Sequence, residues 1–356
     1  MKKLGLVLFI LLASHTSSGQ IFRKFSNEFL NLGVGADAFG MGKAVVASTK
    51  GVNAGYWNPA GLVNIKDTEV SLMQAAYFQG IANYDYAAYA VPINRTSTIA
   101  FYILRFGVDD ILNTTELIDN QGNIDFNRIS LFSATDYAFN IAYAKQLTKR
   151  GLSIGFNAKV IRRIIGKFAN SWGFGLDFGL QYKTKKWNFG LMVRDITTTF
   201  NAWTINQTEF DKIRAAIPDQ NQELPQTIEL SIPKVQLGFA RNFYINYNFS
   251  LLAEADLNIR FKRTNDLIST SLISMSPALG FELNFQDLAF LRGGVTNFQN
   301  KKNFDGSKST ILEPNIGVGF IIRGIQIDYA LSNIGGSSGT LFSNVFSIKI
   351  NLSNFR

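Results

Sequence analysis

Apolar and polar residues alternate with a period of two along most of this chain. From Trp172 to Lys183, Trp, Phe, Leu and Tyr occupy one parity, and Gly, Asp, Gln and Lys occupy the other. The same split recurs over Leu152–Val160 and Phe249–Phe261. A period of two places successive side chains on opposite faces of a β-strand. Strands of about ten residues with one apolar face and one charged face are typical of a transmembrane β-barrel, because its exterior meets lipid and its lumen is polar.

About fourteen such segments follow Asp67, and an even number is what bacterial outer-membrane barrels have. Short turns such as Thr184-Lys185 alternate with long connections such as Ile196–Ser231. This alternation predicts periplasmic turns, external loops and two periplasmic termini. We therefore expect residues 67–356 to form an all-β fold, a transmembrane antiparallel β-barrel in contact with outer-membrane lipid. The expected strands begin near Thr68, Ala82, Thr96, Thr135, Gly151, Ser171, Lys186, Ile232, Tyr247, Ser274, Asp287, Ile311, Gly324 and Phe342, and those near Thr96 and Asp287 alternate poorly.

The N-terminus carries an export pattern. Met1-Lys2-Lys3 is basic, the apolar run Leu4–Ala13 is too short to span a bilayer as a helix, and Ser17-Ser18-Gly19 offers small residues for cleavage. We interpret residues 1–19 as a secretory signal peptide rather than as a buried N-terminal helix. The chain has no cysteine that could carry a lipid anchor. The expected location is therefore the outer membrane of a Gram-negative cell.

Composition excludes several classes of chemistry. The only histidine, His15, lies in the predicted signal peptide, and cysteine is absent. The mature chain thus lacks the commonest general base and the commonest metal ligand. We expect no enzyme, no catalytic residue, no metal and no cofactor. The net charge is +9, but Lys and Arg are scattered without a basic stripe of interleaved aromatics. This distribution argues against nucleic acid as a partner.

The segment 20–66 does not show the alternation of the later strands, and we predict that it forms a plug, or hatch, inside the barrel. Phe25 and Phe29 are spaced for one helical face, and a glycine-rich stretch follows. Gly35 and Gly40 lie five positions apart, which does not match a dinucleotide-binding loop, so close backbone packing explains the glycines better. A turn is predicted at Asn58, Pro59, Ala60 and Gly61.

At this segment a resemblance becomes visible. Residues 27–62 read NEFLNLGVGADAFGMGKAVVASTKGVNAGYWNPAGL. The Gly-x-Gly-Ala and Gly-Met pattern, together with the Asn-Pro-Ala-Gly turn, resembles the N-terminal region of the PorV/PorQ family of Bacteroidetes outer-membrane proteins. These are relatives of the FadL long-chain fatty-acid transporters. The stretch Arg194–Trp203 is also similar to the PorV branch.

The resemblance implies a fourteen-stranded barrel with the N-terminal segment as a hatch inside it. It also implies a non-enzymatic role in the type IX protein secretion system. A component of this kind receives cargo that carries a C-terminal signal from the translocon and hands it on for attachment at the cell surface. The alternative hypothesis is a FadL-like transporter of hydrophobic small molecules, which predicts an apolar pocket between hatch and barrel wall.

The longest external connection, Ile196–Ser231, bears on the choice of partner. Thr208 can cap a short helix at its N-terminus. This helix can either cover the barrel mouth as a lid or expose an apolar surface to a partner. The predicted partner patch consists of Phe200, Trp203, Phe210, Ile213 and Ile217.

Charged residues of both signs are predicted to face the lumen. They can form ion pairs with one another inside a plugged lumen, or they can form a site that selects what passes through it. Glu254 and Asp256 are two residues apart on one strand, and thus about 7 Å apart by the strand rise. Neither a base, a nucleophile nor a set of metal ligands accompanies them, so we assign no acid–base chemistry. The predicted lumen charges are Lys159, Arg163, Asp177, Glu254, Asp256, Arg260, Glu282 and Asp328.

Overall fold

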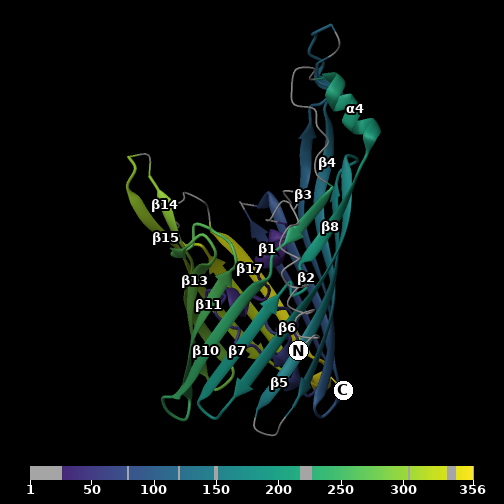
Figure 1. Ribbon diagram of the computed structural model, residues 1–356. Coiled ribbons are helices and arrows are strands. Elements are labelled where there is room, and N and C mark those ends of the chain that lie inside the picture. The colour runs from purple at the N-terminus through teal and green to yellow at the C-terminus, as the bar shows by residue number, and fades with distance from the viewer. Residues whose placement is uncertain are drawn as a thin grey trace, which may run out of the picture.

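The computed structural model describes residues 26–77, 80–118, 121–147, 151–216, 227–303, 305–334 and 342–355, so the predicted signal peptide lies outside it. The chain forms one closed antiparallel β-barrel (Figure 1). Closure is made by the first and last strands, which pair from Glu69↔Asn351 to Ala76↔Asn344. The fourteen wall strands are β1 (Glu69–Tyr77), β2 (Ala82–Asn94), β3 (Ser97–Asn113), β4 (Ser130–Gln146), β5 (Leu152–Ile165), β6 (Ala169–Lys183), β7 (Trp187–Arg194), β10 (Lys234–Tyr244), β11 (Phe249–Arg260), β13 (Ser274–Phe285), β14 (Ala289–Lys302), β15 (Lys308–Ile322), β16 (Ile325–Ser332) and β17 (Ser343–Asn351).

The predicted strand order and number are therefore confirmed, including the two poorly alternating segments, which form β3 and β14. Three shorter strands extend the sheet: β8 (Thr199–Ile205), β9 (Ile228–Ser231) and β12 (Ile268–Ser269). On β5 the lumen side carries the buried Asn157 and Lys159, whereas Phe156 and Val160 are exposed on the exterior. This is the expected distribution for a barrel that meets lipid.

The segment before β1 fills the lumen as a compact plug, which we call the hatch (residues 26–66). It contains η2 (Glu28–Asn31), α2 (Ala36–Gly40), α3 (Ala54–Trp57) and η3 (Pro59–Asn64). The other helical segments are η5 (Phe126–Arg128), α4 (Gln207–Ala216) and η6 (Leu352–Phe355). Within the described ranges, no helix is long and apolar enough to cross a membrane.

Glycines on the lumen face let the hatch pack directly against the wall. A Cβ atom at Gly190 of β7 would lie 2.4 Å from the Val46 carbonyl oxygen, and one at Gly294 of β14 would lie 2.3 Å from the Met41 carbonyl carbon. Real Cβ atoms do not make such contacts. The alternation of the strands thus supplies glycine where the hatch backbone touches the barrel.

Helix α4 stands above one side of the barrel, beside the extended ends of β3 and β4 (Figure 1). Its Lys212 amine lies 3.6 Å from a carboxylate oxygen of Glu116, which follows β3. The lid interpretation is therefore wrong for this helix, because its contact is with a neighbouring extension of the wall. The helix also begins earlier than predicted: the Asn206 side chain accepts a hydrogen bond from the Glu209 amide at 3.4 Å, and Thr208 lies inside the helix.

Candidate functional site: a notch in the barrel wall

The barrel wall is interrupted between two paired blocks of strands. The ladder of β7 and β10 ends at Arg194↔Lys234, and the ladder of β8 and β9 begins at Thr199↔Ser231. Residues 195–198 and 232–233 between these blocks have no ladder partner, while β6 runs past both blocks without a break. Among the described strands, β9 pairs on one side only. We call this interruption, bounded by residues 194–199 and 231–234, the wall notch.

The backbone of the notch adopts dihedral angles that are incompatible with a regular β-ladder. Asp195 and Thr198 have φ values of 56° and 59°, a region that residues other than glycine, asparagine and aspartate rarely adopt and that is unusual for the β-branched Thr198. The Ile196 amide still donates to the Leu176 carbonyl of β6 at 2.9 Å. The exterior beside the notch is apolar, since Phe174 and Phe200 expose 42% and 47% of their surface. The interruption therefore borders the apolar, lipid-facing side of the wall.

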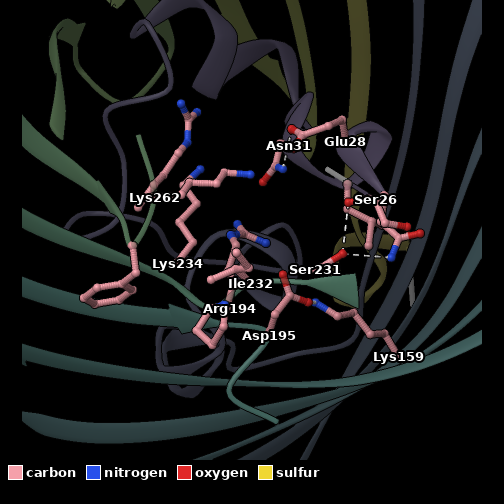
Figure 2. Close-up of a pocket in the computed structure, with 15 residues that line it drawn as sticks. Ser26, Glu28, Asn31, Lys159, Arg194, Asp195, Ser231, Ile232, Lys234 and Lys262 are labelled. Carbon is pink, nitrogen blue, oxygen red and sulfur yellow. Dashed lines mark hydrogen bonds and ion pairs between the residues drawn. The ribbon is translucent and has the colours of Figure 1, made fainter. Parts of the chain in front are cut away.

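A cavity of about 40 Å³ lies between the notch and the first residues of the hatch (Figure 2). The barrel wall contributes Arg194, Asp195 and Ser231 among others, and the hatch contributes residues 26–28, 30 and 31. Figure 2 shows Lys159 reaching the Asp195 carboxylate at the edge of this space. The volume has room for about one water molecule, so the site as observed is closed.

Hydrogen bonds hold the hatch start to the rim above the notch. The Asn201 amide nitrogen donates to Ser26 Oγ at 2.6 Å and to Asn27 Oδ1 at 2.8 Å. Asn27 Nδ2 donates to Ser231 Oγ at 3.1 Å, and Ser231 Oγ donates to the Ser26 carbonyl at 2.9 Å. Ser26 Oγ donates to a Glu229 carboxylate oxygen at 3.0 Å. We call these five bonds the rim bonds, and they close the notch from the lumen side.

Positive charge predominates around this cavity. Its lining includes five cationic side chains and two carboxylates, Glu28 and Asp195. Lys159 is 3% exposed and forms ion pairs of 2.7 Å with Asp177 and 2.6 Å with Asp195. These two acids neutralise Lys159. The cationic residues are Lys159, Arg194, Lys234, Arg260 and Lys262, of which Arg260 also pairs with Asp266 at 3.0 Å.

Arg194 joins the notch to the hatch. Its guanidinium lies 4.5 Å from the centre of the Tyr56 ring and donates to the Tyr56 carbonyl at 2.9 Å and to Gln236 Oε1 at 2.8 Å. Burial raises the pKa of Tyr56, although the Arg194 charge acts against this shift. The phenol therefore stays neutral and donates to the Leu30 carbonyl at 2.6 Å. Movement of Arg194 at the notch would therefore disturb its contacts with Tyr56 of the hatch.

The predicted carboxylate pair on β11 anchors the hatch rather than forming a chemical site. Asp256 Oδ2 accepts hydrogen bonds from the amides of Val45 and Val46 at 2.9 and 3.1 Å. Glu254 Oε1 accepts a bond from the Ala47 amide at 2.6 Å. Buried carboxylates are stabilised by such backbone donors. The other predicted lumen charges are also paired, as in the contacts of Arg292 with Glu282 at 2.6 Å and with Asp328 at 2.7 Å.

The predicted hatch turn marks the start of η3. Asn58 Oδ1 accepts a bond from the Ala60 amide at 3.2 Å, and its Nδ2 donates to the carbonyls of Val46 at 3.0 Å and Leu180 at 3.1 Å. Pro59 occupies the first helical turn, and Gly61 is buried. A Cβ at Gly155 of β5 would lie 2.4 Å from the Ala60 nitrogen. The turn thus fixes the hatch to the wall.

The predicted partner patch does not form a single surface. Phe200 and Trp203 lie on strand β8, not in a loop, and face opposite sides of the wall. Phe200 is on the exterior, whereas Trp203 lies under the Arg163 guanidinium at 5.1 Å on the lumen side. Phe210 is half-buried on α4, which also contains Ile213. Ile217 lies outside the described residues.

A larger cavity of about 260 Å³ lies between the hatch and the wall near the end of the barrel that carries the short turns. Apolar Trp57 and Phe290 line it together with the charged Asp37, Arg292 and Lys349. The pocket expected for a transporter of hydrophobic molecules is therefore present as a space, but its lining is mixed rather than apolar.

Comparison with solved structures relates the fold to transport channels. The chain is similar to the CymD monoaromatic hydrocarbon channel, at 12% identity and a TM-score of 0.57, with 89% of this chain and 96% of that chain covered. The Pseudomonas putida toluene transporter TodX gives 13% identity and a TM-score of 0.57, with 94% and 100% covered. The Ralstonia pickettii toluene transporter TbuX gives 13% identity and a TM-score of 0.52, with 90% and 98% covered. No family model and no curated protein sequence matches the chain.

These similarities define a class by architecture: the chain is a barrel of fourteen strands closed around an N-terminal hatch, a fold that it shares with these channels. A closed barrel with an apolar exterior satisfies all backbone groups within a bilayer, which supports an outer-membrane location.

Proposed function

We propose that the protein transports hydrophobic small molecules across the outer membrane, with the wall notch as a lateral exit and the hatch start as its gate. The observation that carries the proposal is the position of residues 26–31, which cover the notch from inside and are held by the rim bonds. A barrel whose lumen is plugged needs a path that avoids the plug. A notch that borders the lipid-facing side of the wall provides one for a molecule that prefers lipid to water.

Displacement of the hatch start would expose an apolar surface in the lumen. Phe29 and Leu30 belong to one buried cluster with Tyr84, Tyr86 and Tyr102 of β2 and β3. The hydroxyl oxygens of Tyr84 and Tyr86 are buried without a hydrogen-bond partner among the described residues. An aromatic wall with polar edges suits a hydrophobic ligand that is positioned by few polar contacts.

The charge around the notch supports an amphiphile with an anionic end, such as a fatty acid, over a plain hydrocarbon. Arg194 and Lys234 line the cavity and, within the described residues, form no ion pair like those that neutralise Lys159. The structural neighbours, by contrast, are described as hydrocarbon and toluene channels. Both probes are therefore compared in the test.

The test is uptake of radiolabelled toluene and of a radiolabelled long-chain fatty acid by cells whose outer membrane contains the protein, relative to cells with an empty vector. We expect faster uptake of a hydrophobic probe with the protein, and a larger gain for the fatty acid. Equal uptake with protein and vector for both probes would exclude transport. A gain for toluene alone would refute the role of the cationic lining while leaving transport intact.

A second candidate is a component of type IX secretion, as the resemblance to the PorV/PorQ family implies. What supports it is that the two segments that carry the resemblance touch each other: Asn201 bonds to Asn27, and Arg194 bonds to Tyr56. In this role the notch rim would bind the end of a cargo protein. Affinity purification from solubilised outer membranes distinguishes the roles, because a secretion component co-purifies proteins that share a C-terminal sorting domain.

A further inference from the structure

The exterior of the barrel carries a groove far from the wall notch. A space of about 790 Å³ lies over the outer faces of β7, β10, β11, β13, β14 and β15. One row of directly paired residues crosses these six strands. At the usual strand spacing, the row measures about 24 Å from the first strand to the sixth, which is roughly the length of an extended acyl chain. Its members in order are Trp187, Arg241, Ala253, Phe281, Gly293 and Ile316.

Small residues create the depression. Ala253 lies between Arg241 and Phe281 in the row, and Gly293 lies between Phe281 and Ile316. A Cβ at Gly293 would lie 2.3 Å from the Phe281 ring, so that ring covers the glycine. Lipid-facing positions of a barrel usually carry large apolar side chains. The small side chains here leave a shallow channel with apolar walls.

Arg241 closes one end of the groove. Its guanidinium stacks 4.5 Å from the Trp187 ring and 4.6 Å from the Phe243 ring. The Nε atom is buried and has no hydrogen-bond partner, and no acidic side chain of the described residues pairs with Arg241. An unpaired cation on the lipid-facing side of a barrel is costly unless an anion reaches it.

The depth of Arg241 indicates where that anion comes from. The residue lies three positions before the end of β10 at Tyr244, where a short periplasmic turn follows. The distance along the strand is about 10 Å. Tyr244 and Tyr247 of this end are 75% and 100% exposed, as expected for an interfacial aromatic belt. The Arg241 side chain thus lies within about 10 Å, along the strand, of this interfacial end, so a phosphate of the lipid leaflet at this end is the nearest source of an anion.

We propose that this groove is a specific site for a glycerophospholipid of the periplasmic leaflet. One acyl chain lies over Ala253 and against the Phe281 ring that covers Gly293, and the phosphate accepts hydrogen bonds from the Arg241 guanidinium. Aromatic rings on both sides hold the guanidinium planar and limit its rotamers, so that its free edge is presented to the phosphate. The site is independent of the transport function.

The barrel supplies a matched control. Arg162 of β5 is also on the exterior and pairs across the ladder with a tryptophan, Trp172, whose ring lies 4.7 Å from its guanidinium. Arg162, however, already donates to Asn170 Oδ1 at 2.6 Å and lies near the outer end of its strand. An Arg–Trp pair alone is therefore not enough to define the site.

Native mass spectrometry of the purified full-length barrel with added phosphatidylglycerol tests the proposal. We expect Arg241→Gln to weaken phosphatidylglycerol binding about tenfold or more, as for loss of a charge-assisted hydrogen bond, and Arg162→Gln to leave it unchanged. Ala253→Leu fills the groove while keeping the Arg241 charge and should weaken binding as well. Diacylglycerol, which lacks the phosphate, should bind weakly to all variants.

Three results would overturn the proposal. The first is equal phosphatidylglycerol binding by the wild type and Arg241→Gln. The second is equal loss in Arg162→Gln and Arg241→Gln. The third is full competition by millimolar inorganic phosphate with no effect of Ala253→Leu, which would reveal an anion site rather than a lipid site. Heat-modifiable mobility of each folded barrel in gels shows that a loss of binding is not a loss of fold.

Discussion

Asn201→Ala should loosen the hatch start without disturbing the rest of the barrel. The Asn201 side chain makes two of the five rim bonds, to Ser26 at 2.6 Å and to Asn27 at 2.8 Å. Each neutral hydrogen bond contributes about 0.5–1.5 kcal/mol net, so the loss amounts to about 1–3 kcal/mol. The population with the hatch start detached should therefore rise about 5- to 150-fold.

Hydrogen–deuterium exchange in lipid nanodiscs measures this population. The amide of Leu30 donates to the Asn27 carbonyl at 2.9 Å, and that of Gly33 donates to the Tyr56 hydroxyl at 3.1 Å. Both exchange through local opening, so their rates should rise by the same factor as the open population. Amides of η3, which is anchored through Asn58, should keep their rates.

Asn140→Ala is the matched control for this substitution. Asn140 is also a buried lumen-facing asparagine, but its bonds go to the wall, to the Ala138 carbonyl at 3.2 Å and from Asn157 Nδ2 at 3.2 Å. Unchanged exchange of residues 28–33 in Asn201→Ala would refute the rim bonds as a latch. Faster exchange of equal size in both variants would show general loosening of the barrel instead.

Three further substitutions test how the hatch and the notch are held. Gly190→Leu should displace the hatch through its contact at Val46 and lower the unfolding temperature in a gel-shift assay, whereas the outward Ala87→Val should not. Asp256→Ala leaves two hatch amides unbonded and should destabilise by about 2–5 kcal/mol, seen as faster proteolysis of the hatch; an unchanged rate would contradict the anchor. Lys159→Met should cost about 3–5 kcal/mol in chemical denaturation because its two buried acids lose their partner, and neutralising those acids as well should restore stability.

The wall of the barrel could be predicted because its physics is local. Alternation fixes which side chains face lipid, and the parity of turns and loops recovered β3 and β14 where alternation was weak. The same alternation could have separated Phe200 from Trp203, since residues three apart on a strand face opposite sides. The length of the connection Ile196–Ser231 predicts a loop, and strand β8 lies within this connection.

The notch and the hatch contacts depend on tertiary structure, and the sequence shows little of them. Pro233 was the one visible signal, because proline interrupts a ladder. The positive φ angles of Asp195 and Thr198 could not be predicted, because neither position is a glycine. The inward position of Asp256 was predicted, but its partners lie about 210 residues away in the hatch, and only the folded barrel brings them together.

The most direct test of the account is to lock the hatch start to the notch rim and measure transport. Ser231 Oγ donates to the Ser26 carbonyl at 2.9 Å, and the chain has no native cysteine, so a Ser26→Cys/Ser231→Cys pair can be bridged selectively by a short bis-methanethiosulfonate reagent. We expect uptake of the hydrophobic probe to fall to the vector level when the pair is bridged and to return after reduction, with neither single-cysteine variant affected. Undiminished uptake in the fully bridged protein would contradict the lateral exit.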